Sequence, residues 1–191
     1  WDGRAQSVFN GVNNWGLRDA KASVWYARTP NELTRKTVAI NNASLASQAV
    51  GPALSTFEMS GAGRDFPDIG KRLLAARPLA QQQVHLRDSV LGGFAREGNG
   101  LTVATYADLV RKAFRKEWWQ ALSSIRDDGS ESASEKEERR KVAASNGLTR
   151  LDNDNASGKF AVSLEEYTQM EANFSLFFGL AIQMYEATLI S

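Results

Sequence analysis

The chain has 191 residues, and its 23 lysines and arginines nearly balance its 22 aspartates and glutamates, which leaves a formal net charge of +1. With no strongly basic stretch, this balance argues against a nucleic-acid partner held by charge. The chain contains no cysteine and a single histidine, His85. It can therefore form no disulfide, no cysteine-ligated zinc site, no C-x-x-C-H haem attachment and no multi-histidine metal cluster of its own. A chain of this length can bury a sizeable core as one domain.

The first half of the sequence predicts short elements joined by long loops. Residues 1–30 mix glycine and asparagine with scattered aromatic residues, which indicates an irregular packed loop with room for one short helix. Residues 31–60 are expected to contain a helix that Gly51-Pro52 should end or kink. A short helix is expected over 68–74, and the glycine-containing stretch 81–100 is expected to be loop.

The second half predicts two stronger helices. Apolar residues recur at helical spacing from Tyr106 to Leu122, which predicts a helix over 105–126. A second helix is expected from Ser163, where Ser163-Leu164-Glu165-Glu166 has the capping-box pattern. Its apolar centre, 174–182, is too short and too polar at its ends to span a membrane, so a buried core helix is expected. The charged stretch 130–144 predicts an exposed helix or a partly mobile loop.

Glu58 is the candidate for acid–base chemistry. It stands between Phe57 and Met59, and burial among apolar neighbours would suit a carboxyl group to proton transfer near neutral pH. The alternative is a partly exposed loop carboxylate, because one carboxylate alone is a weak signal.

Two further candidates have simpler structural explanations. The stretch from Asp152 to Glu165 is similar to a calcium-binding loop, but its glycine is seventh and its glutamate fourteenth, where sixth and twelfth are required. A turn followed by a helix cap is therefore expected, with a weak calcium site as the alternative. His85 has apolar neighbours and is expected to be structural, with a haem ligand as the alternative.

Two motifs carry a family resemblance. The chain opens with the run W-D-G-R-A, which starts at Trp1, and continues with a Q-x3-P-x5-E-M pattern. The second pattern consists of Gln48, Pro52, Glu58 and Met59. Together they resemble the bacterial di-haem cytochrome c peroxidase family, which includes the MauG-like enzymes. The stretches 106–114 and 181–191 are similar to two helical segments of that family.

The resemblance implies a mainly α, irregular, c-type cytochrome-like domain and a redox function. The enzyme would reduce peroxide, or perform a related haem-based oxidation, with electrons relayed between two c-type haems. Glu58 would be the acid–base group and Gln48 its hydrogen-bonding neighbour. Pro52 and Met59 would form the pocket wall, and Trp1 would be the aromatic residue between the haems.

The departures from the family define what this chain is expected to be. Both haem-attachment motifs are absent, so residues 1–191 are expected to form the single segment between the two haems, which are attached outside it. The expected partners are the remainder of the di-haem polypeptide and an electron-donor redox protein, in the periplasm or another extracytoplasmic location. The alternative is a non-catalytic helical scaffold or accessory subunit that packs against haem-bearing chains.

Overall fold

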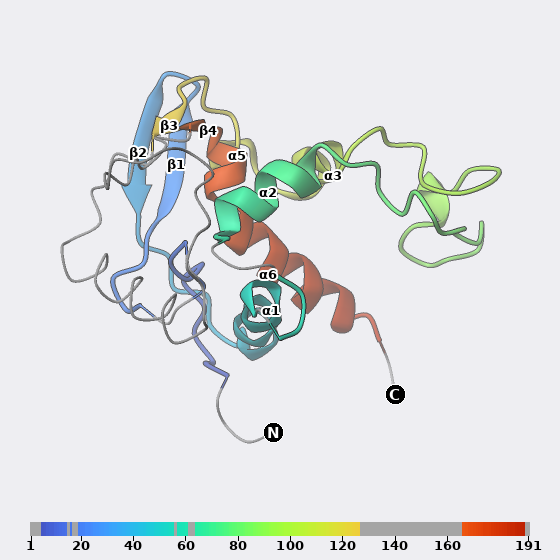
Figure 1. Ribbon diagram of the computed structural model, residues 1–191, viewed down its shortest axis with the longest axis horizontal. Coiled ribbons are helices and arrows are strands. Elements are labelled where there is room, and N and C mark those ends of the chain that lie inside the picture. The colour runs from blue at the N-terminus through green and yellow to red at the C-terminus, as the bar shows by residue number, and fades with distance from the viewer. Residues whose placement is uncertain are drawn as a thin grey trace, which may run out of the picture.

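The computed structural model describes residues 5–14, 16, 19–55, 57–60, 64–126 and 166–189. They form a mostly helical body with small antiparallel ladders and long loops (Figure 1), as the sequence predicts. The helices are α1 (Ser44–Leu54), α2 (Phe66–Leu74), α3 (Tyr106–Ala113), α5 (Gln169–Ala172) and α6 (Phe174–Glu186), with single 3-10 turns η1 (Gly92–Phe94) and η2 (Lys116–Trp118). Strand β1 (Val24–Thr29) pairs with β2 (Glu32–Lys36), and β3 (Ile125–Arg126) pairs with β4 (Glu166–Tyr167).

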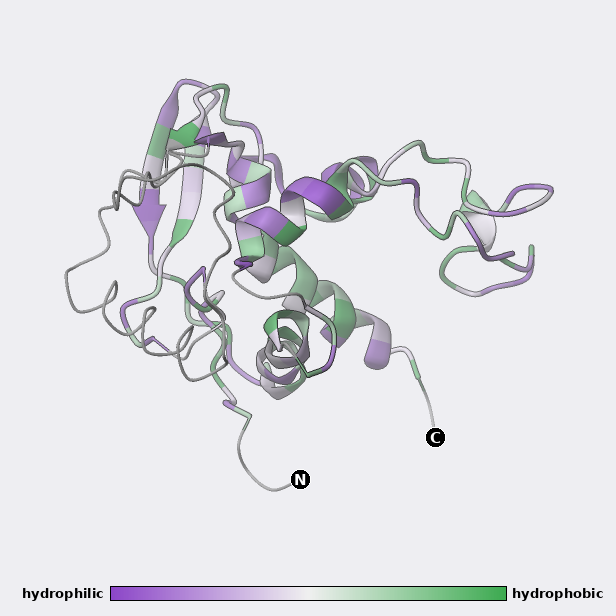
Figure 2. Ribbon diagram, in the orientation of Figure 1, coloured by the Kyte–Doolittle hydropathy of each residue, from purple (hydrophilic) through white to green (hydrophobic). Residues whose placement is uncertain are grey.

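Helix α6 is the centre of the core. It is the most continuously hydrophobic helix in Figure 2, and it packs against α1 and α2. Its buried aromatic residues are Phe174 and Phe177, and the Phe177 ring lies 4.7 Å from the ring of Phe114. Burial of large apolar side chains of this kind contributes about 1.5–3 kcal/mol each. The N-terminal segment joins this core through Phe9, which is 1% exposed and whose backbone pairs with Ile40.

A glycine lets α1 and α6 approach closely. A Cβ atom at Gly179 would lie 2.8 Å from Cζ of Phe9 and 2.9 Å from the backbone oxygen of Ala46. Gly179→Ala is therefore expected to lower the free energy of unfolding by about 1–3 kcal/mol, because neither the packed ring nor the backbone can yield without cost. Chemical denaturation followed by circular dichroism measures this difference.

The matched control is Gly51→Ala, also within a helix. A Cβ atom at Gly51 meets nothing within 4 Å, so the change should alter the free energy of unfolding by less than about 1 kcal/mol. Its gain in helix propensity is limited because the position precedes Pro52. Equal effects of the two substitutions would show that the close approach at Gly179 does not matter.

Two buried side-chain amides attach β1 to the helices. Asn173, which is 1% exposed, accepts a hydrogen bond from the Trp25 amide at 2.8 Å and donates to the Trp25 carbonyl at 2.7 Å and the Trp118 carbonyl at 2.9 Å. Gln169, fully buried, donates to the Trp25 and Glu117 carbonyls and accepts from the amide of Ala121. Both amides therefore replace the strand partner that β1 lacks on this side.

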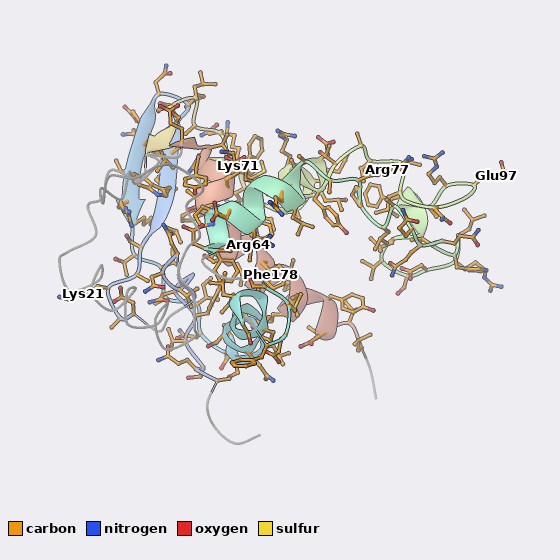
Figure 3. The ribbon with its side chains drawn as sticks, viewed as in Figure 1. Lys21, Arg64, Lys71, Arg77, Glu97 and Phe178 are labelled. Atoms are coloured by element: carbon orange, nitrogen blue, oxygen red, sulfur yellow. The ribbon has the colours of Figure 1, made fainter. Side chains whose placement is uncertain are left out.

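A long irregular segment, residues 77–105, projects from the helical body (Figure 1). Its ends meet where the Tyr106 amide donates to the Ala76 carbonyl at 3.0 Å. Arg77 lies nearer the body and Glu97 toward the far end (Figure 3). Leu101 is 1% exposed yet is not part of the main core, so the segment has a small core of its own. The loop predicted over 81–100 is confirmed, apart from η1.

The helix predicted over 105–126 is too long. Helix α3 ends at Ala113, since Phe114 adopts an extended conformation (φ −114°, ψ 148°). This break lets the Phe114 ring pack on Phe177, and the Trp119 indole Nε1 donates to the Phe114 carbonyl at 3.0 Å. Tertiary packing of the aromatic residues has overridden the helical spacing.

The N-terminal region holds a hairpin that the prediction of irregular loop missed. Strands β1 and β2 flank a turn at Pro30, and the β-forming run Val24-Trp25-Tyr26 was the available signal. The helices predicted within 31–60 and at 68–74 are confirmed as α1 and α2. The predicted start at Ser163 lies outside the described residues, but the helix predicted from it is wrong at Glu166–Tyr167, which form strand β4, and a capping box at Thr168 and Glu171 opens α5.

Candidate functional site

Glu58 lies in a turn that follows the end of α1. The amides of Glu58, Met59 and Ser60 all donate to the Ser55 carbonyl, which fixes the turn. Glu58 is exposed, as are Phe57 (91%) and Met59 (67%). The apolar neighbours therefore do not bury the carboxyl group within the described chain. Phe57 and Met59 instead present exposed apolar surface on either side of Glu58 in the turn.

The other matched positions lie on α1. Gln48 is exposed and Pro52, one helical turn further on, is half-buried, while α1 buries Ala46, Val50 and Ala53 against the core. Gln48 and Pro52 thus lie on one side of the helix, away from the core. Among the described residues, no hydrogen bond joins Gln48 to Glu58. Trp1 lies outside the described residues.

A small cavity of about 160 Å³ lies between the N-terminal segment and α1, and its lining residues include Phe9, Asn10, Ser47 and Val50. Gln48, Pro52 and Glu58 do not line it. The candidate site is therefore an exposed surface on the α1 side of the molecule and not this cavity.

His85 lies on the projecting segment and is exposed. Its Nδ1 accepts a hydrogen bond from the Arg87 amide at 3.1 Å. The neighbouring Asp88 carboxylate accepts from the amides of Leu91 and Val90, and these hydrogen bonds lower the pKa of Asp88. Both side chains therefore hold a turn of the segment. The ligand alternative for His85 stays a prediction.

Among the described residues, neither a metal-binding cluster nor a membrane-spanning helix is found. Over the described ranges, no group of three or more histidine, cysteine, aspartate or glutamate side chains is placed to hold a metal ion. The calcium-loop candidate from Asp152 to Glu165 lies outside those ranges. None of the helices in the described part of the chain is long and apolar enough to cross a membrane.

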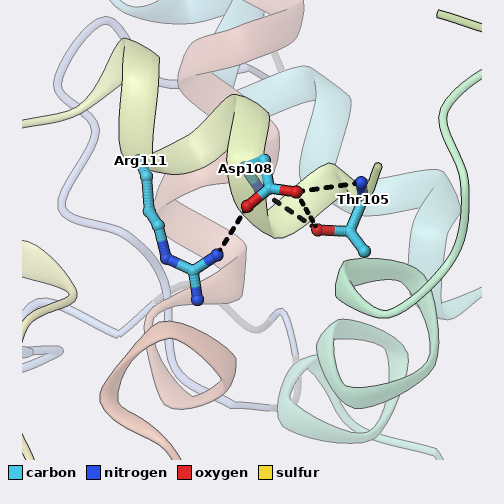
Figure 4. A network of polar contacts seen from close by, with 3 residues as sticks. All are labelled: Thr105, Asp108 and Arg111. Atoms are coloured by element: carbon cyan, nitrogen blue, oxygen red, sulfur yellow. Dashed lines mark hydrogen bonds and ion pairs between the residues drawn. The ribbon is translucent and has the colours of Figure 1, made fainter. Parts of the chain in front are cut away.

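The start of α3 carries a charged cap (Figure 4). Asp108 accepts hydrogen bonds from the Thr105 hydroxyl at 2.9 Å and the Thr105 amide at 3.1 Å, and Arg111 donates to it at 2.9 Å. The Thr105 hydroxyl, followed by the Thr105 amide and Arg111, lowers the pKa of Asp108 below its ordinary value of 3.8. A lowered pKa in the folded state means that the ionised cap stabilises the fold above the unfolded pKa, and that this contribution is lost as the pH falls through the folded pKa.

Thr105→Val is expected to raise the pKa of Asp108 toward 3.8, because it removes the hydroxyl donor with little change in volume. A pH titration of the Asp108 carboxyl carbon by NMR measures this change. Arg111→Gln should produce a smaller rise, since the arginine is the weaker influence and lies in an exposed pair. An unchanged titration in Thr105→Val would contradict the assignment of the hydroxyl as the main cause.

The hairpin carries a cluster of cations on aromatic rings, which the sequence prediction did not identify. The Arg35 guanidinium lies 4.5 Å from the centre of the Trp25 ring, and the Lys36 ammonium lies 4.6 Å from that of Tyr26. The Tyr26 and Trp118 rings meet edge to face with their centres 5.2 Å apart. The signal was the strand pairing of V-W-Y with L-T-R-K, which places Trp25 directly opposite Arg35 and Tyr26 diagonal to Lys36.

A comparison of the chain with protein-family models, with curated proteins and with solved structures finds no match.

Proposed function

We propose that this chain is the segment between the two haems of a di-haem peroxidase-like enzyme, with Glu58 as its acid–base group. The two motifs at Trp1 and at Gln48–Met59 support the family. The observation that carries the proposal is the turn after α1, where an exposed carboxylate stands between Phe57 and Met59, 91% and 67% exposed. Such an apolar surface is costly in water unless another group covers it.

The residues of this chain can form one wall of a haem site, but they cannot attach the haem covalently. The chain has no cysteine for a thioether bond, and its single histidine lies on the projecting segment. The Phe57–Met59 turn, in contrast, offers apolar side chains that can lie against a flat macrocycle held by neighbouring sequence. The c-type cytochrome-like domain would therefore be completed by the rest of the polypeptide, and an electron-donor protein would reduce it in the periplasm or another extracytoplasmic location.

The haem groups supply the redox chemistry when bound. The chain contributes proton handling: the Glu58 carboxylate takes a proton from one peroxide oxygen and delivers it to the other, which assists cleavage of the O–O bond. Gln48 is the proposed hydrogen-bonding neighbour of the carboxylate once the site is completed, since no hydrogen bond joins the two side chains in the described chain. Pro52 and Met59 limit the approach of water. Trp1 is the proposed aromatic residue between the two haems.

Haem staining tests the proposal directly. Expressed with the haem-maturation machinery, residues 1–191 alone should give no haem-staining band on a denaturing gel, because a covalent linkage needs cysteine thiols. The intact gene product, with the sequence on both sides restored, should stain. Absence of staining in the intact product, or staining of the isolated chain, would refute the di-haem proposal.

An accessory subunit that packs against haem-bearing chains is the second proposal. It is favoured by exposed apolar residues near the C-terminal end of α6, where Met184, Tyr185 and Leu189 are 65%, 56% and 61% exposed. A pyridine-haemochrome spectrum of the intact gene product separates the two proposals. Two haems per chain support the enzyme, and none supports the accessory subunit.

A further inference from the structure

Strand β2 has an outer edge that no other described strand pairs with. In an antiparallel pair, opposite residues alternate between those that exchange backbone hydrogen bonds and those that do not. Trp25 gives its backbone N–H to Asn173, and its carbonyl accepts from Asn173 and Gln169, so it faces away from β2. Its partner Arg35 must then direct its own N–H and C=O away from β1. Leu33, which lies opposite Ala27, likewise directs its N–H and C=O away from β1.

Nothing in the described part of the chain occupies this edge. The backbone groups of Leu33 and Arg35 have no further hydrogen-bond partner there, and β2 is exposed at every position except the half-buried Leu33. β1, in contrast, is covered on its other side by the two buried amides. Among the described residues, the hairpin is thus anchored on one side and open on the other. An open strand edge is a template for another strand.

The charge around this edge is positive. Within 24–36 the hairpin carries Arg28, Arg35 and Lys36 against the single Glu32, a net charge of +2. None of the three cations has a carboxylate partner among the described residues. The neighbouring carboxylate of Glu117 is held by Arg115 at 2.9 Å, which lowers the pKa of Glu117. The hydrophilic tip of β2 is visible in Figure 2.

The geometry points to β2 as a docking site for an extended, acidic peptide segment of a partner protein, which adds to the hairpin as a third strand. The backbone of Leu33 and Arg35 supplies the hydrogen bonds. Arg35 and Lys36 project to opposite faces of the strand, so two adjacent acidic residues of the added strand can each meet one cation. This site is independent of the haem proposal.

A single-stranded nucleic acid fits this site less well. Such ligands need free aromatic faces on which bases stack. Here the cations of Arg35 and Lys36 occupy one face of the Trp25 and Tyr26 rings, at 4.5 and 4.6 Å from the ring centres. Stacking on these faces would first have to displace the cations. Backbone pairing leaves the cation–aromatic contacts in place.

Fluorescence anisotropy with a short labelled peptide tests the docking site. The probe has two adjacent glutamates flanked by alternating valine and threonine. Its control has the same sequence but is N-methylated at alternate residues, which keeps the charge and removes the pairing N–H groups. The probe should bind the wild-type protein, and the control should bind at least about tenfold more weakly because each lost hydrogen bond leaves a strand group unpaired. Equal binding of both, or of a single-stranded oligonucleotide in preference to the probe, would overturn the docking site.

Two substitutions at one position separate charge from pairing. Arg35→Thr removes the charge but keeps the outward N–H, and should weaken binding by about two- to fivefold. Arg35→Pro removes the charge and the N–H together, and should abolish binding, whereas the β1–β2 ladder keeps all its hydrogen bonds. Equal binding by the two variants would refute strand addition.

Hydrogen exchange on the wild-type protein gives a readout that does not depend on a variant folding. Addition of the probe should slow exchange of the Leu33 and Arg35 amides, whereas the amides of Tyr26 and Thr34, within the ladder, should change little. Unchanged exchange at Leu33 and Arg35 with the probe bound would overturn the proposal.

Discussion

Asn173→Ala is expected to lower the free energy of unfolding by about 3 kcal/mol or more. The substitution removes the acceptor for the Trp25 amide and the donor for the Trp118 carbonyl, and the Asn173 side chain that makes both hydrogen bonds is 1% exposed. A buried backbone group left without a partner costs about 1–3 kcal/mol, and here two are lost together. Denaturant titration followed by tryptophan fluorescence measures the change.

Gln120→Ala is the matched control. The Gln120 amide also donates to a β1 carbonyl, that of Ala27 at 2.9 Å, but Gln120 is half-buried and water can replace it. Its loss should cost less than about 1 kcal/mol. A cost for Asn173→Ala as small as that of the control would show that the buried amides do not hold β1 to the helices.

The contrast between these amides and the predicted elements shows what the sequence could reveal. Helices α1 and α2 follow from the local spacing of apolar residues and from residues that mark helix ends. One such residue is Pro52, which lies two positions before the last residue of α1. The roles of Asn173 and Gln169 depend on Trp25, 148 and 144 residues away along the chain. No local pattern encodes such a distant partner, although an asparagine and a glutamine within an apolar stretch are a signal worth examining.

The break at Phe114 has the same origin. The spacing of apolar residues continues past Ala113, so the local pattern favours helix. The chain instead turns to place Phe114 against Phe177 and Trp118 against Tyr26. The gain from packing these rings exceeds the small helix propensities at stake, which are below about 1 kcal/mol per residue.

The sequence predicted which residues make up the candidate site, but not how exposed they are. The motif identifies Gln48, Pro52, Glu58 and Met59, and the structure places them on α1 and in the turn after it. The sequence could not reveal that Phe57 and Met59 would be exposed, because apolar residues are usually buried. This exposure is what makes a covering group part of the proposal.

Glu58→Gln in the intact, haem-loaded protein is expected to reduce turnover with peroxide by about 10²-fold or more. The glutamine keeps the size and the hydrogen-bonding oxygen of the side chain but cannot accept and release a proton at neutral pH. Steady-state kinetics with a chemical electron donor measures the loss. The pyridine-haemochrome spectrum gives the haem content of each variant. This content must equal that of the wild type, so that a loss of turnover can be assigned to proton transfer and not to missing haem.

The control for this change is Glu97→Gln, which alters an exposed carboxylate toward the far end of the projecting segment (Figure 3) and should leave turnover unchanged. Met59→Leu provides a second comparison, because it keeps an apolar wall beside Glu58 without affecting a proton, and should change turnover by less than about tenfold. Wild-type turnover in Glu58→Gln would remove Glu58 from the mechanism even if the haems are present. Equal losses in Glu58→Gln and Met59→Leu would assign the turn a role in packing against the haem and not in proton transfer.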